Sequence, residues 1–213
     1  MRLRRLSLPT VILIAAVAAA TPVSAQQGQG VRPLAPDQAQ QARPRAPAPL
    51  KVDRAQRLNA LFEALKAAPN ARAAQMVESR IEAMMLQSGS DTADLLMVRA
   101  RSVIEAKDYD LSLQLLDSII ELSPDFTEAY AQRATVHFLK KDIYRSVADL
   151  QVVISREPRH FAAFAGLAVI FQDLGDNKRA LDAFRRAMQV NPHIKGVQQI
   201  IKRLEVKVEG REI

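Results

Sequence analysis

The side chains that could carry chemistry are few and scattered along this chain. No cysteine occurs among the 213 residues, which excludes disulfides, thiolate metal sites and cysteine nucleophiles. The histidines His137, His160 and His193 are too far apart for a metal site on one helix, where two would stand three or four residues apart. The sequence has neither a G-x-S-x-G nucleophile motif nor a glycine-rich phosphate loop. We therefore expect no enzyme, no cofactor and no bound metal.

Three aspartates recur at an interval of 34 residues, at Asp108, Asp142 and Asp176. Paired carboxylates could do acid–base work. However, residues that repeat with a fold lie one repeat apart along an edge, so capping of turns is the favoured interpretation. His137 occupies the same column as Val103 and Phe171, which favours a packed histidine over a functional one.

The aspartates belong to a gapless repeat of three blocks, 91–124, 125–158 and 159–192. Other columns of the repeat are identical or keep their character. They are the alanines Ala100/Ala134/Ala168, the prolines Pro124/Pro158/Pro192, the large residues Leu96/Tyr130/Phe164 and Leu116/Leu150/Phe184, and the small residues Ser112/Ser146/Ala180.

Each column has a physical reason. Apolar positions recur at helical spacing in two runs per block, with the aspartate between the runs. Proline closes each block because it ends the preceding helix at little cost. Small residues in both runs would let two helices approach to about 8–10 Å. Each block is therefore predicted to be a helical hairpin, whose apolar face is completed by stacking on its neighbours.

The blocks resemble tetratricopeptide repeats. The third block is the most similar, in Phe164, Leu167, Ala168, Phe171, Ala180, Phe184 and Pro192. The first two blocks have Arg99 and Arg133 where the family has leucine. The resemblance implies an all-α, right-handed solenoid of helical hairpins that binds a protein or peptide partner.

The flanking segments predict additional helices. Residues 51–90 are interpreted as a degenerate hairpin, with Asp53 as a possible cap and a turn at Pro69-Asn70. The methionines in its second run either fill the core, which is favoured, or form an adaptable binding patch. Residues 193–213 are predicted to form a C-terminal capping helix.

The resemblance also implies that the first helix of each hairpin lines a concave groove. The candidate groove residues are Met97, Arg101, Ile104, Thr135, Phe138, Leu139, Val169 and Gln172. The wider predicted wall also includes Asp94, Glu105, Glu128, Ala131, Ala162, Ala165 and Asp173. Family members that hold a partner's terminal carboxylate have Lys and Asn in this wall, and this sequence has neither there. An extended or helical peptide with an apolar anchor suits the wall better. Packing between repeats is the alternative for any one residue, and self-association is the alternative function.

The N-terminal 50 residues indicate export. Residues 1–25 combine Arg2, Arg4 and Arg5, the apolar run 11–20 and the small residues 23–25, as a cleavable signal peptide does. An uncleaved anchor is the alternative, although the run is shorter than the roughly 20 residues that a span needs. Cleavage near Ala25 would leave a periplasmic or secreted protein without a stable membrane span. It would also lower the net charge from +7 to +4.

Residues 26–50 contain five prolines and six glutamines, and are predicted to be a disordered linker. The linker is interpreted either as a spacer or docking peptide, or as a solvated tail without a specific role. From Lys51 onward the chain has 24 basic and 22 acidic residues without a concentrated basic run. Nucleic acid is therefore not an expected partner.

Overall fold

The computed structural model describes residues 50–210, with side chains from Arg54 onward. Within that range the chain forms nine helices and no strand. The helices are α1 (Leu50–Lys66), α2 (Ala71–Met85), α3 (Asp91–Glu105), α4 (Tyr109–Leu122), α5 (Thr127–Leu139), α6 (Ile143–Arg156), α7 (Phe161–Asp173), α8 (Asn177–Val190) and α9 (Val197–Glu209). None of these helices is long and apolar enough to cross a bilayer. The expectations for residues 1–49 lie outside the described residues.

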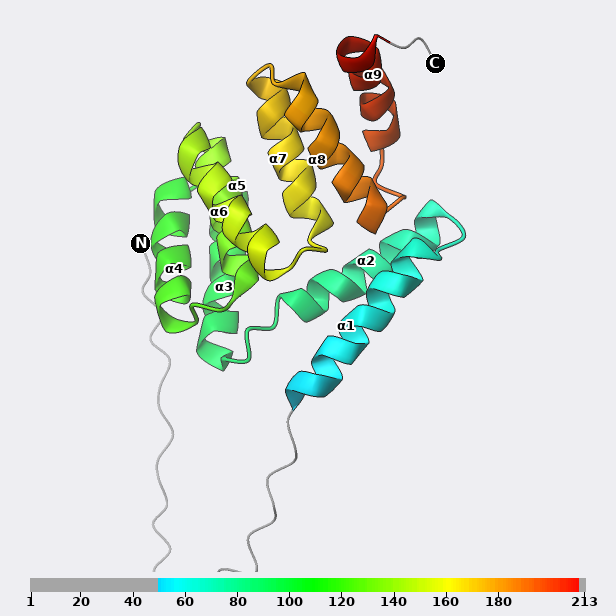
Figure 1. The fold of residues 1–213 in the computed structure, drawn as a ribbon. Coiled ribbons are helices and arrows are strands. Elements are labelled where there is room, and N and C mark those ends of the chain that lie inside the picture. Colours follow the sequence, from blue (N-terminus) through cyan, green and yellow to red (C-terminus); the bar gives the residue numbers. More distant parts are fainter. Residues whose placement is uncertain (1–49, 211–213) are drawn as a thin grey trace, which may run out of the picture. The chain divides into compact units, whose positions relative to one another are not determined.

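Helices α3 to α9 form the predicted solenoid of hairpins (Figure 1). Each helix from α3 to α8 packs against the next, and α9 packs on α8. Ala100, Ala134 and Ala168 are all almost completely buried, which fits the requirement that neighbouring helices approach closely at this column. The all-α solenoid with a terminal helix is therefore confirmed. The last helix begins at Val197, four residues after the predicted start of the segment.

The aspartate column caps the second helix of each hairpin, as predicted. The side chains of Asp108, Asp142 and Asp176 accept hydrogen bonds from the backbone N–H groups of Leu111, Arg145 and Arg179. The aspartate backbone N–H also reaches back to the preceding helix, for example from Asp142 to the His137 carbonyl at 2.8 Å. One residue thus ends the first helix and starts the second.

The hairpin α1–α2 packs differently from the others. A small apolar cluster joins Phe62, Leu65 and Ile81 to Phe161, which begins α7, and to Val190, which ends α8. Polar contacts follow the same route, from Arg159 to Asn59 at 2.6 Å and from Asn191 to Glu78 at 2.6 Å. The first hairpin therefore contacts the third repeat. Asp53 lies inside α1 and is not its cap, because the helix begins at Leu50.

Candidate functional site

A cavity of about 500 Å³ lies between α2, α5, α6 and α7. Its lining comprises Glu78, Ile81, Glu82 and Met85 of α2, Glu128, Ala131, Gln132, Ala134, Thr135 and Phe138 of α5, Ser146 and Leu150 of α6, Arg159 and His160 of the connecting turn, and Phe161, Ala162, Ala163, Gly166, Val169 and Ile170 of α7. We call this cavity the groove. Its volume is within the range of about 300–1,000 Å³ that is typical of ligand-binding pockets.

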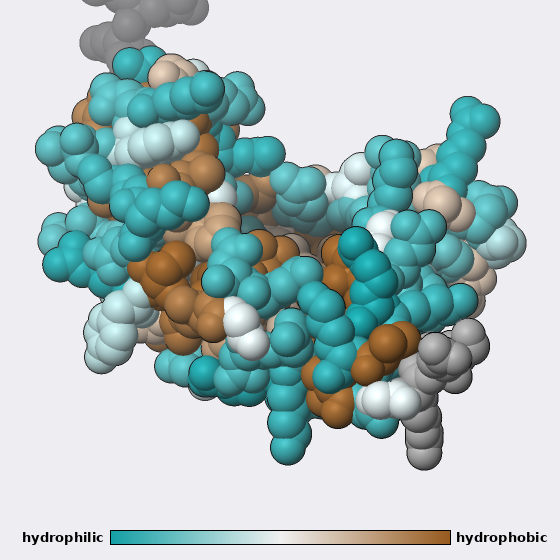
Figure 2. All heavy atoms as spheres, turned by 90° about the horizontal axis from the view of Figure 1, so that it is seen from above, coloured by the Kyte–Doolittle hydropathy of each residue, from teal (hydrophilic) through white to brown (hydrophobic). Residues whose placement is uncertain are grey.

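The groove lining is mostly apolar and is reachable from solvent. Thr135 and Val169 are exposed, and Phe138 is half-buried against the core. Residues at these positions come from the first helices of the second and third repeats, α5 and α7, and α2 supplies the opposite side. Figure 2 shows apolar side chains within a hollow whose surroundings are largely polar. An apolar ligand side chain would lose water against such a lining.

A buried histidine–glutamate pair stands in the groove. His160 Nδ1 accepts the backbone N–H of Ala163 at 3.0 Å, and so caps α7. Because Nδ1 is an acceptor, Nε2 must carry the ring proton, and it donates to Glu128 Oε1 at 3.0 Å. Glu128 is only 7% exposed. The imidazole is therefore neutral in this arrangement, and Glu128 gains a hydrogen bond without a countercharge.

Two further carboxylates line the groove on α2. Glu82 is paired with Arg101 of α3 at 3.1 Å. Glu78 accepts from the amide of Asn191 at 2.6 Å, which is a neutral partner. The cation of the lining, Arg159, is already held by Glu157 at 2.8 Å and lies over the ring of Phe62. The groove is thus apolar with an excess of negative charge.

The structure divides the eight predicted groove residues into two groups. Thr135, Phe138 and Val169 line the groove, whereas Leu139 and Gln172 are exposed outside its lining. The interpretation of Met97 as a groove residue is wrong, because its side chain is 2% exposed within the core formed with α4 and α5.

The other two α3 candidates also lie outside the groove. Ile104 packs against the same core as Met97, and Arg101 contributes only through its bond to Glu82. The groove lies between α2 and the second and third repeats, whereas α3 belongs to the first, so these α3 residues do not line it.

The contribution of α2 to the groove was not predicted from the sequence. Glu78, Ile81, Glu82 and Met85 reach the groove because the first hairpin packs on Phe161 and Val190. Met85 thus has a lining role, Met84 is half-buried and Met76 is 60% exposed. The weak match of residues 51–90 to the repeat was the signal that this hairpin would pack differently.

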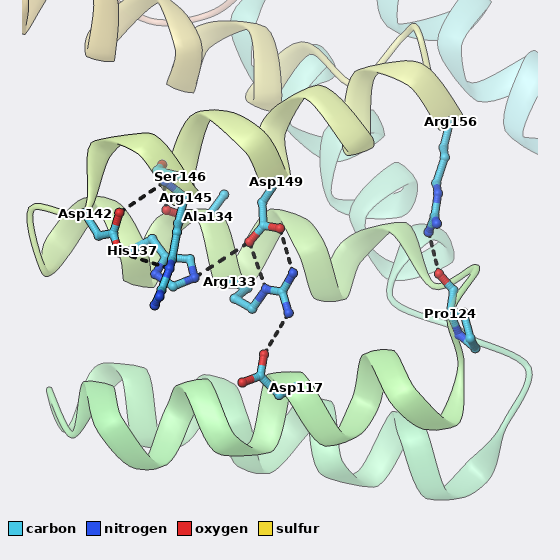
Figure 3. Close-up of polar contacts among 10 residues, drawn as sticks. All are labelled: Asp117, Pro124, Arg133, Ala134, His137, Asp142, Arg145, Ser146, Asp149 and Arg156. Carbon is cyan, nitrogen blue, oxygen red and sulfur yellow. Dashed lines mark hydrogen bonds and ion pairs between the residues drawn. The ribbon is translucent and has the colours of Figure 1, made fainter.

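A second polar cluster connects α4, α5 and α6 (Figure 3). The Arg133 guanidinium bonds both oxygens of Asp149, at 2.9 and 2.8 Å, and reaches Asp117 at 2.7 Å. The hydrogen bond to Asp149 is the main cause that raises the pKa of Arg133 above its ordinary value. His137 lies 4.0 Å from Asp149 and is buried, and desolvation lowers its pKa despite the nearby carboxylates. The packed interpretation of His137 is confirmed.

The described part of the chain does not bring together three or more His, Asp or Glu side chains that could hold a metal ion. The polar clusters are instead ion pairs and caps whose partners lie within the same fold. The groove geometry offers an apolar surface for binding.

Comparison with known proteins identifies the family. The chain is 34% identical over 155 residues to a TPR repeat-containing protein of Rhizobium etli, a match that covers 73% of this chain and 76% of that protein. The chain belongs to the tetratricopeptide-repeat family. A search of family models gave no match.

Solved structures share the fold. The TPR domain of Sgt2 from Aspergillus fumigatus superposes with a TM-score of 0.52 at 16% identity, covering 56% of this chain and 81% of that domain. The first TPR of Spaghetti, bound to the HSP90 peptide SRMEEVD, gives a TM-score of 0.52 at 13% identity, covering 55% and 93%. MamA gives a TM-score of 0.51 at 17% identity and covers 75% of this chain and 81% of its own.

Proposed function

We propose that this protein is an adaptor that holds a segment of a partner protein in the groove. The observation that carries the proposal is an open, apolar cavity on the first helices of two successive repeats. These helices are held by the core before any ligand arrives, so the ordering cost of binding falls mainly on the segment. A solved relative of this fold holds a peptide.

Residue-specific crosslinking tests the site. A photo-crosslinking amino acid at Thr135, which is exposed and lines the groove, should trap the partner in intact cells. The matched control position is Tyr144, which is 87% exposed but lies outside the groove lining. Val169→Asn should strongly reduce the crosslink at position 135, since an amide on the apolar wall would have to be desolvated.

The control variant is Leu174→Asn, at an exposed residue outside the lining, which should leave the crosslink unchanged. Equal crosslinking from positions 135 and 144, or a crosslink that Val169→Asn does not weaken in a folded protein, would contradict the proposal.

We further propose that the adaptor works outside the cytoplasm, periplasmic or secreted, in assembly or remodelling of the cell envelope. The support is the sequence of residues 1–25, with three arginines, an apolar run and small residues before Gln26. Fractionation followed by N-terminal sequencing tests this proposal, with a mature end near Gln26 as the expected result. An intact Met1 on a cytoplasmic protein would overturn it.

Self-association is the second candidate function, and one surface favours it. On α3, Leu95 is 72% exposed and Val98 is 67% exposed. The residues equivalent to Leu95, Ala129 and Ala163, are buried in their own repeats. Light scattering on the wild type and on Leu95→Asp would detect an oligomer formed through α3. A monomer in both proteins would remove this candidate.

A further inference from the structure

We infer that the groove selects a partner segment in which a lysine or arginine stands beside an apolar residue. The inference rests on the proposed function, because it names the chemistry of the segment that the groove would hold. Its basis is the balance of charge on the lining, together with the apolar surface next to those charges.

Two of the four charged side chains on the lining each have a partner of opposite charge outside the lining. Glu82 has Arg101 as its cation at 3.1 Å, and Arg159 has Glu157 as its anion at 2.8 Å. Glu82 and Arg159 therefore already have a countercharge and do not require one from a ligand. The lining pairs therefore account for one carboxylate and one guanidinium.

The other two carboxylates have neutral partners. Glu78 accepts from the Asn191 amide, and Glu128 accepts from His160, whose other nitrogen is an acceptor for the Ala163 N–H. Among residues 54–210, the ion pairs include none that brings a lysine or arginine to Glu78 or Glu128. Two negative charges thus face an apolar cavity without a cation from the described residues.

A cation fits this arrangement better than any other ligand group. Charge interactions strengthen where apolar walls exclude water, so a carboxylate that is 7% exposed, such as Glu128, attracts a cation more strongly than a surface carboxylate does. The methylene stem of lysine or arginine can cover apolar surface, here Phe138 and Val169, while its head reaches a carboxylate. An acidic segment such as SRMEEVD, which the first TPR of Spaghetti binds, would be repelled by the same lining.

Selection from a displayed library of random peptides of about ten residues tests the inference. The bait is the chain expressed with its own residues 1–25 and purified in the form that the cell produces, whether or not these residues have been cleaved off. Peptides enriched by the wild type, but not by the uncharged variant Val169→Asn, should carry lysine or arginine next to an apolar residue. A representative synthetic peptide should bind at least about tenfold more tightly than its glutamate-substituted version.

Charge-neutral variants of the lining isolate the cause. Glu78→Gln and Glu128→Gln keep an oxygen that accepts from Asn191 or His160, and lose only the negative charge. Each should lower the affinity for the cationic peptide several-fold and leave a glutamine-substituted peptide unaffected. Asp173→Asn, at an exposed carboxylate outside the lining, is the matched control and should have no such effect.

The results separate the two levels of the proposal. Val169-dependent peptides without a preference for cations would overturn this inference and leave the groove as a binding site. The absence of any Val169-dependent peptide would overturn the proposed function as well. The chain's own Arg32, Arg43 and Arg45 are another source of cations. Tighter peptide binding when all three are changed to alanine would assign the groove to that segment and overturn a separate partner.

Discussion

The second and third repeats have the same hairpin but different interiors. At the column where Leu167 packs in the third repeat, the second has Arg133. At the column of Ala183 it has Asp149, and at that of Phe171 it has His137. In the third repeat Arg179 lies 4.5 Å from the ring centre of Phe171, whereas His137 in the second lies 4.0 Å from Asp149. Three apolar residues are thus replaced together by three polar ones.

The difference shows that the repeat tolerates a polar interior only when the replacements are matched. Asp149 is nearly buried and is held by two hydrogen bonds from Arg133. Burial of either charge alone would cost more than the pair does, because the remaining ion would lack a partner. The shared backbone is set by the small residues and caps, which both repeats retain.

Arg133→Leu should produce the largest loss of stability, at about 3 kcal/mol. This change places the third repeat's leucine beside a buried Asp149 that has lost its cation. The estimate is at the lower end for buried pairs because the Arg133 side chain is about one-fifth exposed. Chemical denaturation measures the change in the free energy of unfolding.

The double variant Arg133→Leu/Asp149→Ala should recover most of that loss, since it recreates the third repeat's apolar pair. Arg99→Leu, at an exposed residue of the equivalent column, should change stability by less than about 0.5 kcal/mol. A double variant no more stable than the single one would mean that the ion pair itself holds the hairpin together.

Ala134→Leu should have the next largest effect, a loss of about 1–3 kcal/mol from overpacking. Ala134 is 1% exposed where the two helices of the second hairpin meet, and its carbonyl accepts from Ser146 Oγ at 2.8 Å. Ala168→Leu tests the same column in the third hairpin and should cost a similar amount. Thermal melting of both variants checks the prediction, and unchanged melting would refute the equivalence of the column.

The fold followed from the sequence to a greater extent than the site did. Local rules predicted the hairpins, since the columns of Ala134, Asp142 and Pro158 specify contact, turn and helix end within a single block. The groove also needs α2, whose position depends on contacts between residues far apart in sequence, such as Asn191 with Glu78. The pattern of apolar residues in 51–90 does not predict that the hairpin α1–α2 will contact the third repeat. The ion pair of Arg133 and Asp149 could not be predicted from the sequence either. The two residues are 16 positions apart, and only the packing of α5 against α6 brings them together.

Acidification should destabilise the second repeat through His137. Burial lowers the pKa of His137 below its ordinary value near 6.5, so the unfolded chain binds a proton at a higher pH than the folded chain does. The contribution of neutral His137 to the free energy of unfolding is therefore fully present above about pH 6.5. It decreases as pH falls from there toward the folded-state pKa of His137. Asp149 and Asp142 oppose this shift, while Arg133 and Arg145 add to it.

His137→Phe, which supplies the third repeat's residue, should reduce the loss of stability between about pH 7 and pH 5.5. Denaturation curves of the two proteins at both pH values give the comparison. In Arg133→Leu, by contrast, the pKa of His137 should rise, because a cation is removed and Asp149 is left without its partner. NMR titration of the imidazole detects that rise. Identical pH dependence in the wild type and His137→Phe would show that His137 is not the titrating group.

The smallest expected effect lies in the turn between the two helices of each hairpin. The residue before the capping aspartate has a left-handed backbone in both repeats, with φ of 65° at Lys141 and 78° at Gly175. Glycine adopts this conformation without strain and lysine does not. Lys141→Gly should therefore stabilise the second repeat by about 0.5–1 kcal/mol, and Gly175→Ala should destabilise the third by a similar amount.

Opposite signs from these two changes, measured by denaturation, would show that the same turn is strained in one repeat and relaxed in the other. Lys107 has a φ of 62° in the first repeat, so Lys107→Gly should stabilise the protein as Lys141→Gly does. If Lys141→Gly destabilised the protein instead, the lysine side chain would have to contribute more than the backbone strain costs. Its ammonium lies 5.6 Å from the ring centre of Phe138, so Lys141→Ala, which removes that contact and keeps the strain, separates the two terms.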